Sequence, residues 1–269
     1  MWVLLMPPLS RRFRGMVGAT LAALALAATA ARPARAAGGA DPVAGAGAAS
    51  LAQLKALQAA LNATGPDLGG LLSAGPGLDP ALVELRRGVL RKQFPDASWT
   101  LTPGPTLKDG RSTVELSVKG SHRQGGSTFR LEASQLLALS SSDGRVNGQA
   151  VIREQTILRS GDQELPVSLL IPDVVLTGQR YDIDVVFDEP LNGALVAGGL
   201  LALSSRQTTA MEAPRLELDA LGGGGLFKTV QAPYTPGEQT WAVLLVHPKG
   251  IVSATKRVRV VADRTQLTP

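Results

Sequence analysis

The chain has 269 residues, of which 27 are Lys or Arg and 22 are Asp or Glu, and it contains no cysteine. The first 36 residues hold five arginines and no acidic residue, so the remaining chain has as many acidic as basic residues and is neutral. Bulk charge therefore gives no support for nucleic acid or an anionic membrane as a partner. The lack of cysteine excludes disulfides, zinc–thiolate sites, iron–sulfur clusters and cysteine nucleophiles, so stability has to come from hydrophobic cores.

Residues 1–36 are predicted to be a signal peptide. An uncharged apolar run, Met16–Ala30, is followed by Ala34-Arg35-Ala36, whose small residues suit a signal peptidase. The basic residues before the run are Arg11, Arg12 and Arg14. Because the run is shorter than the roughly 20 residues of a membrane-spanning helix, cleavage is expected, with an uncleaved anchor as the alternative. The general secretory route is expected, and the alternative is the twin-arginine route, whose export signal the arginine pair resembles. Both routes lead to the periplasm or the cell exterior.

Two helices are expected next. Residues 37–50 are rich in Ala and Gly and predict a disordered tether, which ends where Ser50 caps the first helix. The apolar face of that helix holds Leu51, Leu54, Leu57 and Leu61. Asp79-Pro80 places a capping side chain before a proline, so a second helix begins there and ends at Phe94-Pro95. Its expected apolar face consists of Leu82, Leu85 and Val89.

From Trp99 onward the apolar period changes from about 3.6 to 2, which predicts strands. The turn signals Gly125-Gly126 and Asp143-Gly144 separate alternating runs. The expected antiparallel meander has four strands, at residues 97–103, 112–121, 128–140 and 145–159. A curved sheet with the helices packed across it would bury both apolar faces, and residues 51–160 would form this first domain.

Ser160-Gly161-Asp162 is a turn and the expected domain boundary. Six strands at the spacing of a β-sandwich follow, at residues 165–171, 180–187, 194–204, 227–231, 240–247 and 251–261. No helical period appears beyond the boundary. Residues 161–262 would form the second domain and 263–269 a tail, and each domain is expected to fold independently.

Part of the sequence resembles the nuclear transport factor 2-like fold, a polyketide-cyclase-like or cystatin-like cone. The resemblance is carried by Phe94–Trp99, by Thr113–Gly120, and by Phe129–Ala133 followed by Asp143–Val146. The resemblance covers about residues 79–159. It implies a cone that holds a small apolar molecule in many members, and in some an Asp and a His for acid–base chemistry. This sequence departs from that pattern, because the predicted strands of the meander contain no Asp and His122 is expected at a hairpin tip. The resemblance therefore implies a fold and no activity.

The run Tyr234–Val246, followed by Pro248-Lys249-Gly250 and Ile251–Val261, resembles the closing hairpin of immunoglobulin-like or fibronectin type III-like domains. The resemblance covers about residues 163–262 and implies a spacer or adhesion module without catalytic residues. The expected fold class is mostly β, an α+β domain with two helices on a curved four-strand antiparallel sheet, followed by an all-β immunoglobulin-like sandwich.

Three sets of side chains are candidates for binding. An apolar set could line the cone and bind a small apolar ligand, with core packing as the alternative: Trp99, Leu101, Phe129 and Leu131. A weak calcium site could form from Asp182, Asp184 and Asp188, with a solvated polar face as the alternative. A basic stripe could dock a partner or form the charged outer face of a sheet: Lys256, Arg257 and Arg259.

No catalytic residue, cofactor or firm metal site is predicted. The chain has two histidines, His122 and His247, and lacks the Gly-x-Ser-x-Gly motif of a serine hydrolase. The leading hypothesis is an exported, non-enzymatic binding or scaffolding protein of the cell envelope, with an envelope protein as partner. Two alternatives stay open: a small apolar ligand carrier or acid–base enzyme that uses the cone, and a structural spacer. Neither nucleic acid as a partner nor a membrane span after leader cleavage is expected.

Cleavage after Ala36 is the first prediction, because small residues at Ala34 and Ala36 follow the apolar run. N-terminal sequencing of the protein isolated from the envelope fraction should begin at Ala37 or within a few residues of it. An isolated protein that retains Met16–Ala30 would contradict the signal-peptide assignment.

Overall fold

The computed structural model describes residues 47–65, 68–161, 165–211 and 214–267. The predicted signal peptide and residues 37–46 of the predicted tether lie outside these ranges. Within them the protein is mostly β, with three α-helices and strands that pair almost throughout in antiparallel fashion. None of the helices in the described ranges has the length and apolar character needed to cross a membrane.

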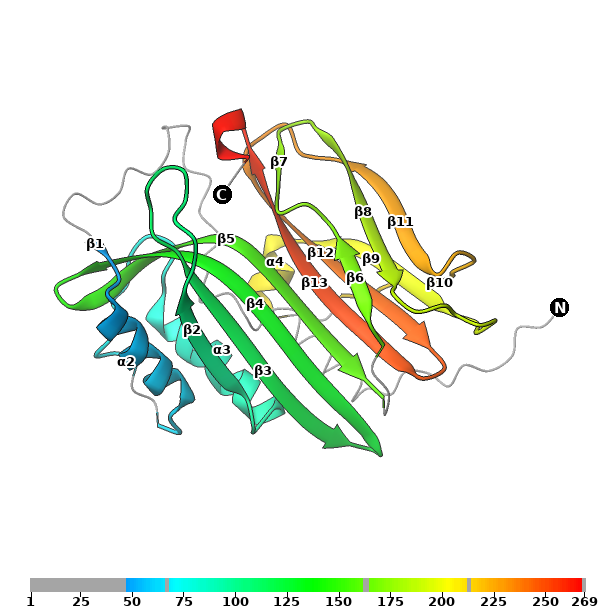
Figure 1. Ribbon diagram of the computed structural model, residues 1–269, viewed down its shortest axis with the longest axis horizontal. Coiled ribbons are helices and arrows are strands. Elements are labelled where there is room, and N and C mark those ends of the chain that lie inside the picture. The colour runs from blue at the N-terminus through cyan, green and yellow to red at the C-terminus, as the bar shows by residue number, and fades with distance from the viewer. Residues whose placement is uncertain (1–46, 66–67, 162–164, 212–213, 268–269) are drawn as a thin grey trace.

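Two helices and a four-stranded antiparallel meander build the first half of the chain (Figure 1). The helices are α2 (Leu51–Asn62) and α3 (Pro80–Gln93), and the strands are β2 (Ser98–Pro103), β3 (Val114–Gln124), β4 (Ser127–Ser142) and β5 (Arg145–Ser160). Both helices begin at the predicted caps. The Ser50 side chain accepts a hydrogen bond from the amide of Gln53, and the Asp79 carboxylate accepts from the amides of Ala81 and Leu82.

A second, three-stranded sheet faces the far part of the main sheet. Its strand order is β11 (Gly225–Gln231), β8 (Arg180–Phe187) and β6 (Val167–Leu170). The main-sheet strands of this half are β9 (Ala197–Leu203), β12 (Gly237–His247) and β13 (Gly250–Val261), with the short strands β7 (Val174–Leu176) on β13 and β10 (Asp219–Ala220) on β9. Tyr181, Ile183 and Val185 alternate along β8 and are buried between the two sheets. The intervening residues of β8 therefore lie on the outer face.

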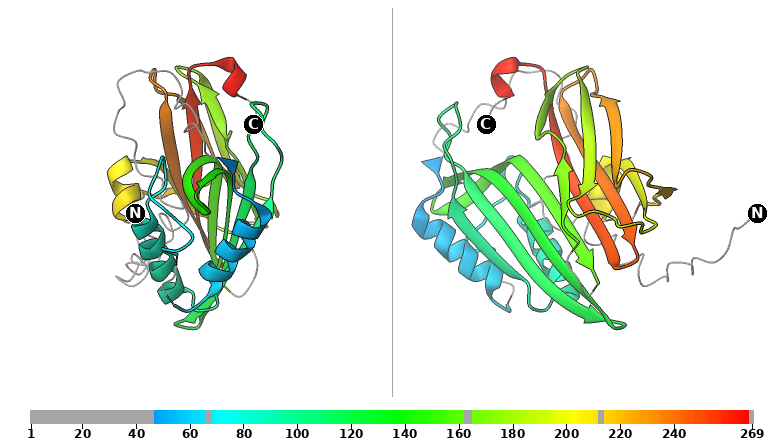
Figure 2. Two further views of the ribbon diagram at one scale, coloured as in Figure 1. Left: turned by 90° about the vertical axis from the view of Figure 1, so that its left-hand side faces the viewer. Right: turned by 45° about the vertical axis from the view of Figure 1, so that its right-hand side comes forward.

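The two halves share one continuous sheet of ten strands, and Figure 2 shows them side by side along it. Strand β13 pairs antiparallel with β5, from Ile251 opposite Ser160 to Lys256 opposite Gln155. The chain passes from one half to the other just after β5, where the sequence predicts a boundary. Independent folding of the two halves stays a prediction, and each half alone would lose this β5–β13 pairing.

The two largest hydrophobic cores lie on opposite faces of the shared sheet. Leu158 belongs to the core beneath α2 and α3, whereas its neighbour Ile157 belongs to the core beneath the three-stranded sheet. Successive side chains of a strand point to opposite faces, so β5 contributes to both cores at once. The helices and the three-stranded sheet consequently cover opposite sides of the molecule.

Five short elements were not expected from the sequence, and two of them are the strands β7 and β10 given above. Gly47–Ala48, within the predicted tether, form β1 and pair with β4. Ser205–Ala210 form α4, which Ser204 and Gln207 cap reciprocally, and Arg264–Gln266 of the predicted tail form a 3-10 turn. Segments of two to six residues are too short for a hydrophobic period to reveal them.

The sequence predicts an exposed basic stripe at Lys256, Arg257 and Arg259. For Lys256 and Arg257 this prediction is wrong. Lys256 and Arg257 are buried, with 6% and 7% of their surface exposed. Lys256 pairs with Asp173, and Arg257 pairs with Glu238 and, at 3.3 Å, with Glu154 of β5. The expectation is wrong because β13 lies inside the sheet, where both of its faces are covered.

Charge pairing offsets the burial of Arg257. Burial lowers the pKa of its guanidinium, but the carboxylates of Glu154 and Glu238 outweigh that effect, so the pKa lies above its usual value. Gln135 of β4 also donates to Glu154, over 2.9 Å. The two halves are thus joined by side chains as well as by main-chain hydrogen bonds.

Replacement of Arg257 by Met should lower the free energy of unfolding by about 3–5 kcal/mol, because the largely buried Glu154 would lose the cation with which it forms an ion pair. Urea unfolding monitored by circular dichroism measures this loss. The matched control is Arg153→Met, which breaks a more exposed pair with Glu115 at 3.8 Å and should cost less than about 1 kcal/mol. Equal losses in the two variants would contradict a special role for the junction.

Candidate functional site

The four apolar residues proposed for the cone come together in the first core. Trp99, Leu101, Phe129 and Leu131 are between 1% and 7% exposed and pack in one cluster with leucines of α2. The guanidinium carbon of Arg91 also lies 5.0 Å from the centre of the Trp99 ring. A ligand at these side chains would have to displace parts of the helices, so their placement fits core packing.

Side chains of α2 close the free edge of β2. The Asn62 amide donates to the Trp99 carbonyl over 2.7 Å and accepts from the Trp99 amide over 3.0 Å, as a neighbouring strand would. Gln58 accepts from the amide of Leu101 over 2.7 Å. Since these groups are the ones that a docking strand would need, β2 is protected against strand addition. The sequence pattern does not reveal this closure, because the residues are about 40 positions apart.

Two arginines of α3 bind the C-terminal carbonyls of α2. Arg87 donates over 3.0 Å to the carbonyl of Leu61, in the last turn of the helix, and Arg91 donates to the same carbonyl over 3.0 Å. Arg87 also donates over 3.1 Å to the carbonyl of Gly65, in the loop that follows the helix. Burial, followed by the nearby charge of Arg87, lowers the pKa of Arg91. The last carbonyls of a helix have no partners within the helix, so these contacts satisfy them. The two helices are thereby fixed relative to each other.

This contact turns α3 away from its expected orientation. The buried residues of the helix are Val83, Arg86, Arg87 and Leu90. Leu85, expected inside with Leu82 and Val89, is 55% exposed. Burial lowers the pKa of Arg86, and the carboxylate of Glu154 opposes this effect. Buried arginines need the carbonyls and carboxylates on this side of α3, which leaves part of the apolar stripe facing outward.

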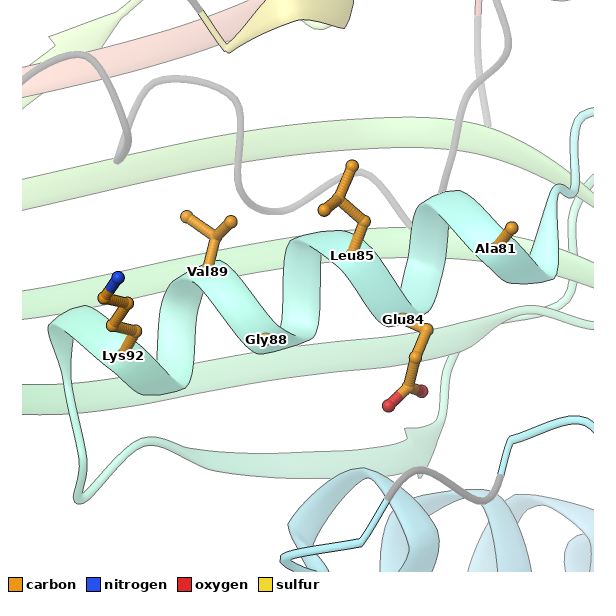
Figure 3. A pocket seen from close by; sticks show the side chains of 6 residues that line it. All are labelled: Ala81, Glu84, Leu85, Gly88, Val89 and Lys92. Atoms are coloured by element: carbon orange, nitrogen blue, oxygen red, sulfur yellow. The ribbon is translucent and has the colours of Figure 1, made fainter.

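The outer face of α3 forms a shallow hollow of about 530 Å³. Its lining residues are Ala81, Glu84, Leu85, Gly88, Val89 and Lys92 (Figure 3). Leu85 and Val89 lie on the same side of the helix, whereas Glu84 points the other way, toward Arg87, with which it forms an ion pair at 2.8 Å. The floor at Gly88 has no side chain. The hollow is therefore apolar in its middle, with the charge of Lys92 at one end.

No contact within the described part of the fold explains why residue 88, in the interior of α3, is a glycine. Among the described residues, a Cβ added at Gly88 would meet no atom within 4 Å. Glycine in a helix interior costs about 1 kcal/mol relative to alanine, and here no internal contact requires it. A glycine at such a place permits close approach of another backbone. The corresponding signal in the sequence is a lone glycine within an amphipathic helix.

The three aspartates proposed as a calcium site have too few other metal-binding side chains close to them. Asp182 and Asp184 share the outer face of β8, and the Asp182 carboxylate accepts from the Thr229 hydroxyl over 2.6 Å. Asp188 follows the strand, and its amide donates to the Pro166 carbonyl. Within the ranges that the structure describes, no three Asp, Glu or His side chains gather closely enough to hold a metal ion.

The two histidines lie in different halves of the protein. His122 is inside β3, opposite Phe129, rather than at the hairpin tip. His247 ends β12, where its ring centre is 5.6 Å from that of Phe187 and where burial, followed by the charge of Lys249, lowers its pKa. Strands β13, β5 and β4 separate β12 from β3, so the histidines are roughly 19 Å or more apart. They do not form a joint catalytic site.

Residues 162–261 match the model of a family described as a domain of unknown function, DUF8623. The match starts two residues after the end of β5 and covers the three-stranded sheet with strands β9, β12 and β13. No curated protein matches the sequence of the chain.

Calcium should leave the melting temperature nearly unchanged, because Asp182 already has a hydroxyl partner and lacks neighbouring ligands. The measurement is a thermal melt of the mature protein in EDTA and in millimolar calcium. It is sensitive, since a ligand at 100 times its Kd adds about 2.7 kcal/mol to stability. A rise of many degrees in calcium would restore Asp182, Asp184 and Asp188 as a metal site.

Proposed function

We propose that this chain is an exported, non-enzymatic binding protein of the cell envelope, which docks a segment of a partner protein on the outer face of α3. The observation that carries the proposal is the exposed Leu85 beside Gly88, a helix-interior glycine without an internal reason. A leucine that is 55% exposed next to a bare backbone offers apolar contact and close approach at the same place.

The partner segment should be apolar and should carry a carboxylate at one end. From Ala81 to Lys92 the hollow follows α3 for roughly 16 Å, which is the length of about three helical turns. Its open form suits a helix or an extended segment, whereas small-molecule sites enclose most of their ligand. Lys92 is the exposed charge at the end of the hollow, so an acidic group of the partner would complement it.

The proposed folds and location agree with this role. We propose a nuclear transport factor 2-like fold for the first half, supported by two helices packed on one side of an antiparallel meander. We propose an immunoglobulin-like sandwich for the second half, supported by two sheets that face each other across a core. The predicted leader of residues 1–36 supports export to the periplasm or the cell exterior by the general secretory or the twin-arginine route.

The test is capture of partners by the immobilised mature protein from an envelope extract, compared with the variant Leu85→Asp. The variant should lose at least about tenfold of the same captured protein, because a charge would enter the apolar middle of the contact. Gly88→Leu should also lose it, because the new side chain fills the hollow. Since Gly88 has open space around it, this second variant should melt no lower than the original protein.

Leu51→Asp is the matched control, since Leu51 lies on α2 and is 55% exposed, as Leu85 is. It should capture the partner as well as the unchanged protein does. Capture that ignores both Leu85→Asp and Gly88→Leu would contradict docking on α3 and favour a structural spacer. A stoichiometric apolar small molecule seen by native mass spectrometry would instead favour a ligand carrier.

A further inference from the structure

The outer face of the three-stranded sheet presents an aromatic ring and a leucine on either side of a carboxylate. Asp184 of β8 stands opposite Leu170 of β6 and opposite Phe227 of β11. Leu170 is 60% exposed and Phe227 is 62% exposed. Directly opposed residues of antiparallel strands have Cβ atoms about 4.5–5.5 Å apart, so the three side chains form one row across the sheet.

The ring of Phe227 is held in place by a glycine. A Cβ at Gly225 would lie 3.0 Å from Cζ of Phe227 and 2.7 Å from Cγ1 of Val186, so the ring tip rests against the bare backbone of Gly225 beside Val186. The aromatic ring thus has a defined position on the sheet while much of it remains exposed. A positioned, exposed ring offers a π-surface to a partner.

Acidic groups dominate the neighbourhood of this ring. Asp182 and Asp184 share the outer face of β8, and the exposed Asp188 and Glu189 follow the strand. The sequence from Tyr181 to Ser205 contains no lysine, arginine or histidine. The basic residues of these strands are at a distance from the row or face the other way, since Arg180 begins β8 and Lys228 is opposite the inward-facing Ile183. This charge distribution complements a cationic partner.

From this arrangement we infer that the outer face of the three-stranded sheet docks a basic segment of a partner protein through an arginine. The guanidinium stacks on the ring of Phe227 and donates hydrogen bonds to the Asp184 carboxylate, while the apolar stem of the arginine contacts the surrounding apolar side chains. Arginine fits better than lysine, because its planar group stacks on a ring and binds a carboxylate through two donors at once.

This surface is separate from the hollow on α3. The three-stranded sheet and the helices cover opposite faces of the main sheet and belong to different halves of the chain. The inference therefore does not depend on the function proposed for α3, and each can fail without the other. Together the two surfaces would let one rigid protein hold two partners.

The probes are fluorescently labelled hexa-arginine and hexa-lysine peptides, which carry the same charge, titrated with the mature protein and followed by anisotropy. The unchanged protein should bind hexa-arginine several-fold more tightly than hexa-lysine. Phe227→Ala should weaken hexa-arginine binding about fivefold and remove the preference over lysine, whereas Phe227→Tyr should retain both. Asp184→Asn should weaken the binding of both peptides, because it removes a charge that both contact.

Leu51→Ala on α2, whose side chain is 55% exposed, is the control and should leave the binding of both peptides unchanged, and thermal melts should show that every variant is folded. The inference is overturned if hexa-arginine does not bind saturably, or if Phe227→Ala binds it as tightly as the unchanged protein does. It is also overturned if Phe227 is required for binding an uncharged oligosaccharide such as chitohexaose while hexa-arginine does not bind, which would assign the face to a glycan.

Discussion

Strand β5 forms hydrogen bonds with β4 on one side and with β13 on the other, and it supplies side chains to both cores. This double use constrains the whole molecule. Leu158 packs beneath the helices and Ile157 beneath the three-stranded sheet, so a shift of β5 that improved one core would disturb the other. Arg257 strengthens the constraint, because it pairs with Glu154 of β5 and with Glu238 of β12. The two halves of the chain are therefore joined through β5.

The exposed stripe of α3 follows from a requirement inside the molecule. Arg87 and Arg91 must reach the last carbonyls of α2, and Arg86 must lie near Glu154. An α-helix at the surface of a protein buries only one of its faces. The arginines and all of the apolar residues of α3 therefore cannot point inward together. Leu85 and Gly88 remain outside as a result. This apolar surface is the one on which we propose that a partner segment docks.

Local signals in the sequence predicted the features that depend on neighbouring residues. Ser50 and Asp79 cap their helices, and the turns at Gly125-Gly126 and Asp143-Gly144 connect the meander strands. Two predictions failed where the feature depends on residues far away in the sequence. The orientation of α3 depends on carbonyls more than twenty residues away, and the burial of Arg257 depends on a carboxylate about a hundred residues away. Periodicity states which residues share a face but not which face turns inward.

The sheet edges indicate how this protein can meet partners. Gln58 and Asn62 occupy the main-chain groups of β2 that an added strand would use. On β11 the exposed Lys228 stands opposite Ile183, on the inward-facing side, and a lysine in that position opposes pairing with another strand. These two edges are thus protected against the addition of a strand from another chain. Strand addition uses main-chain hydrogen bonds and therefore depends little on the sequence of the added strand. Leu85 beside Gly88 and Phe227 beside Asp184 are exposed, and the docking that we propose for each would depend on side-chain shape and charge, which discriminate between partners.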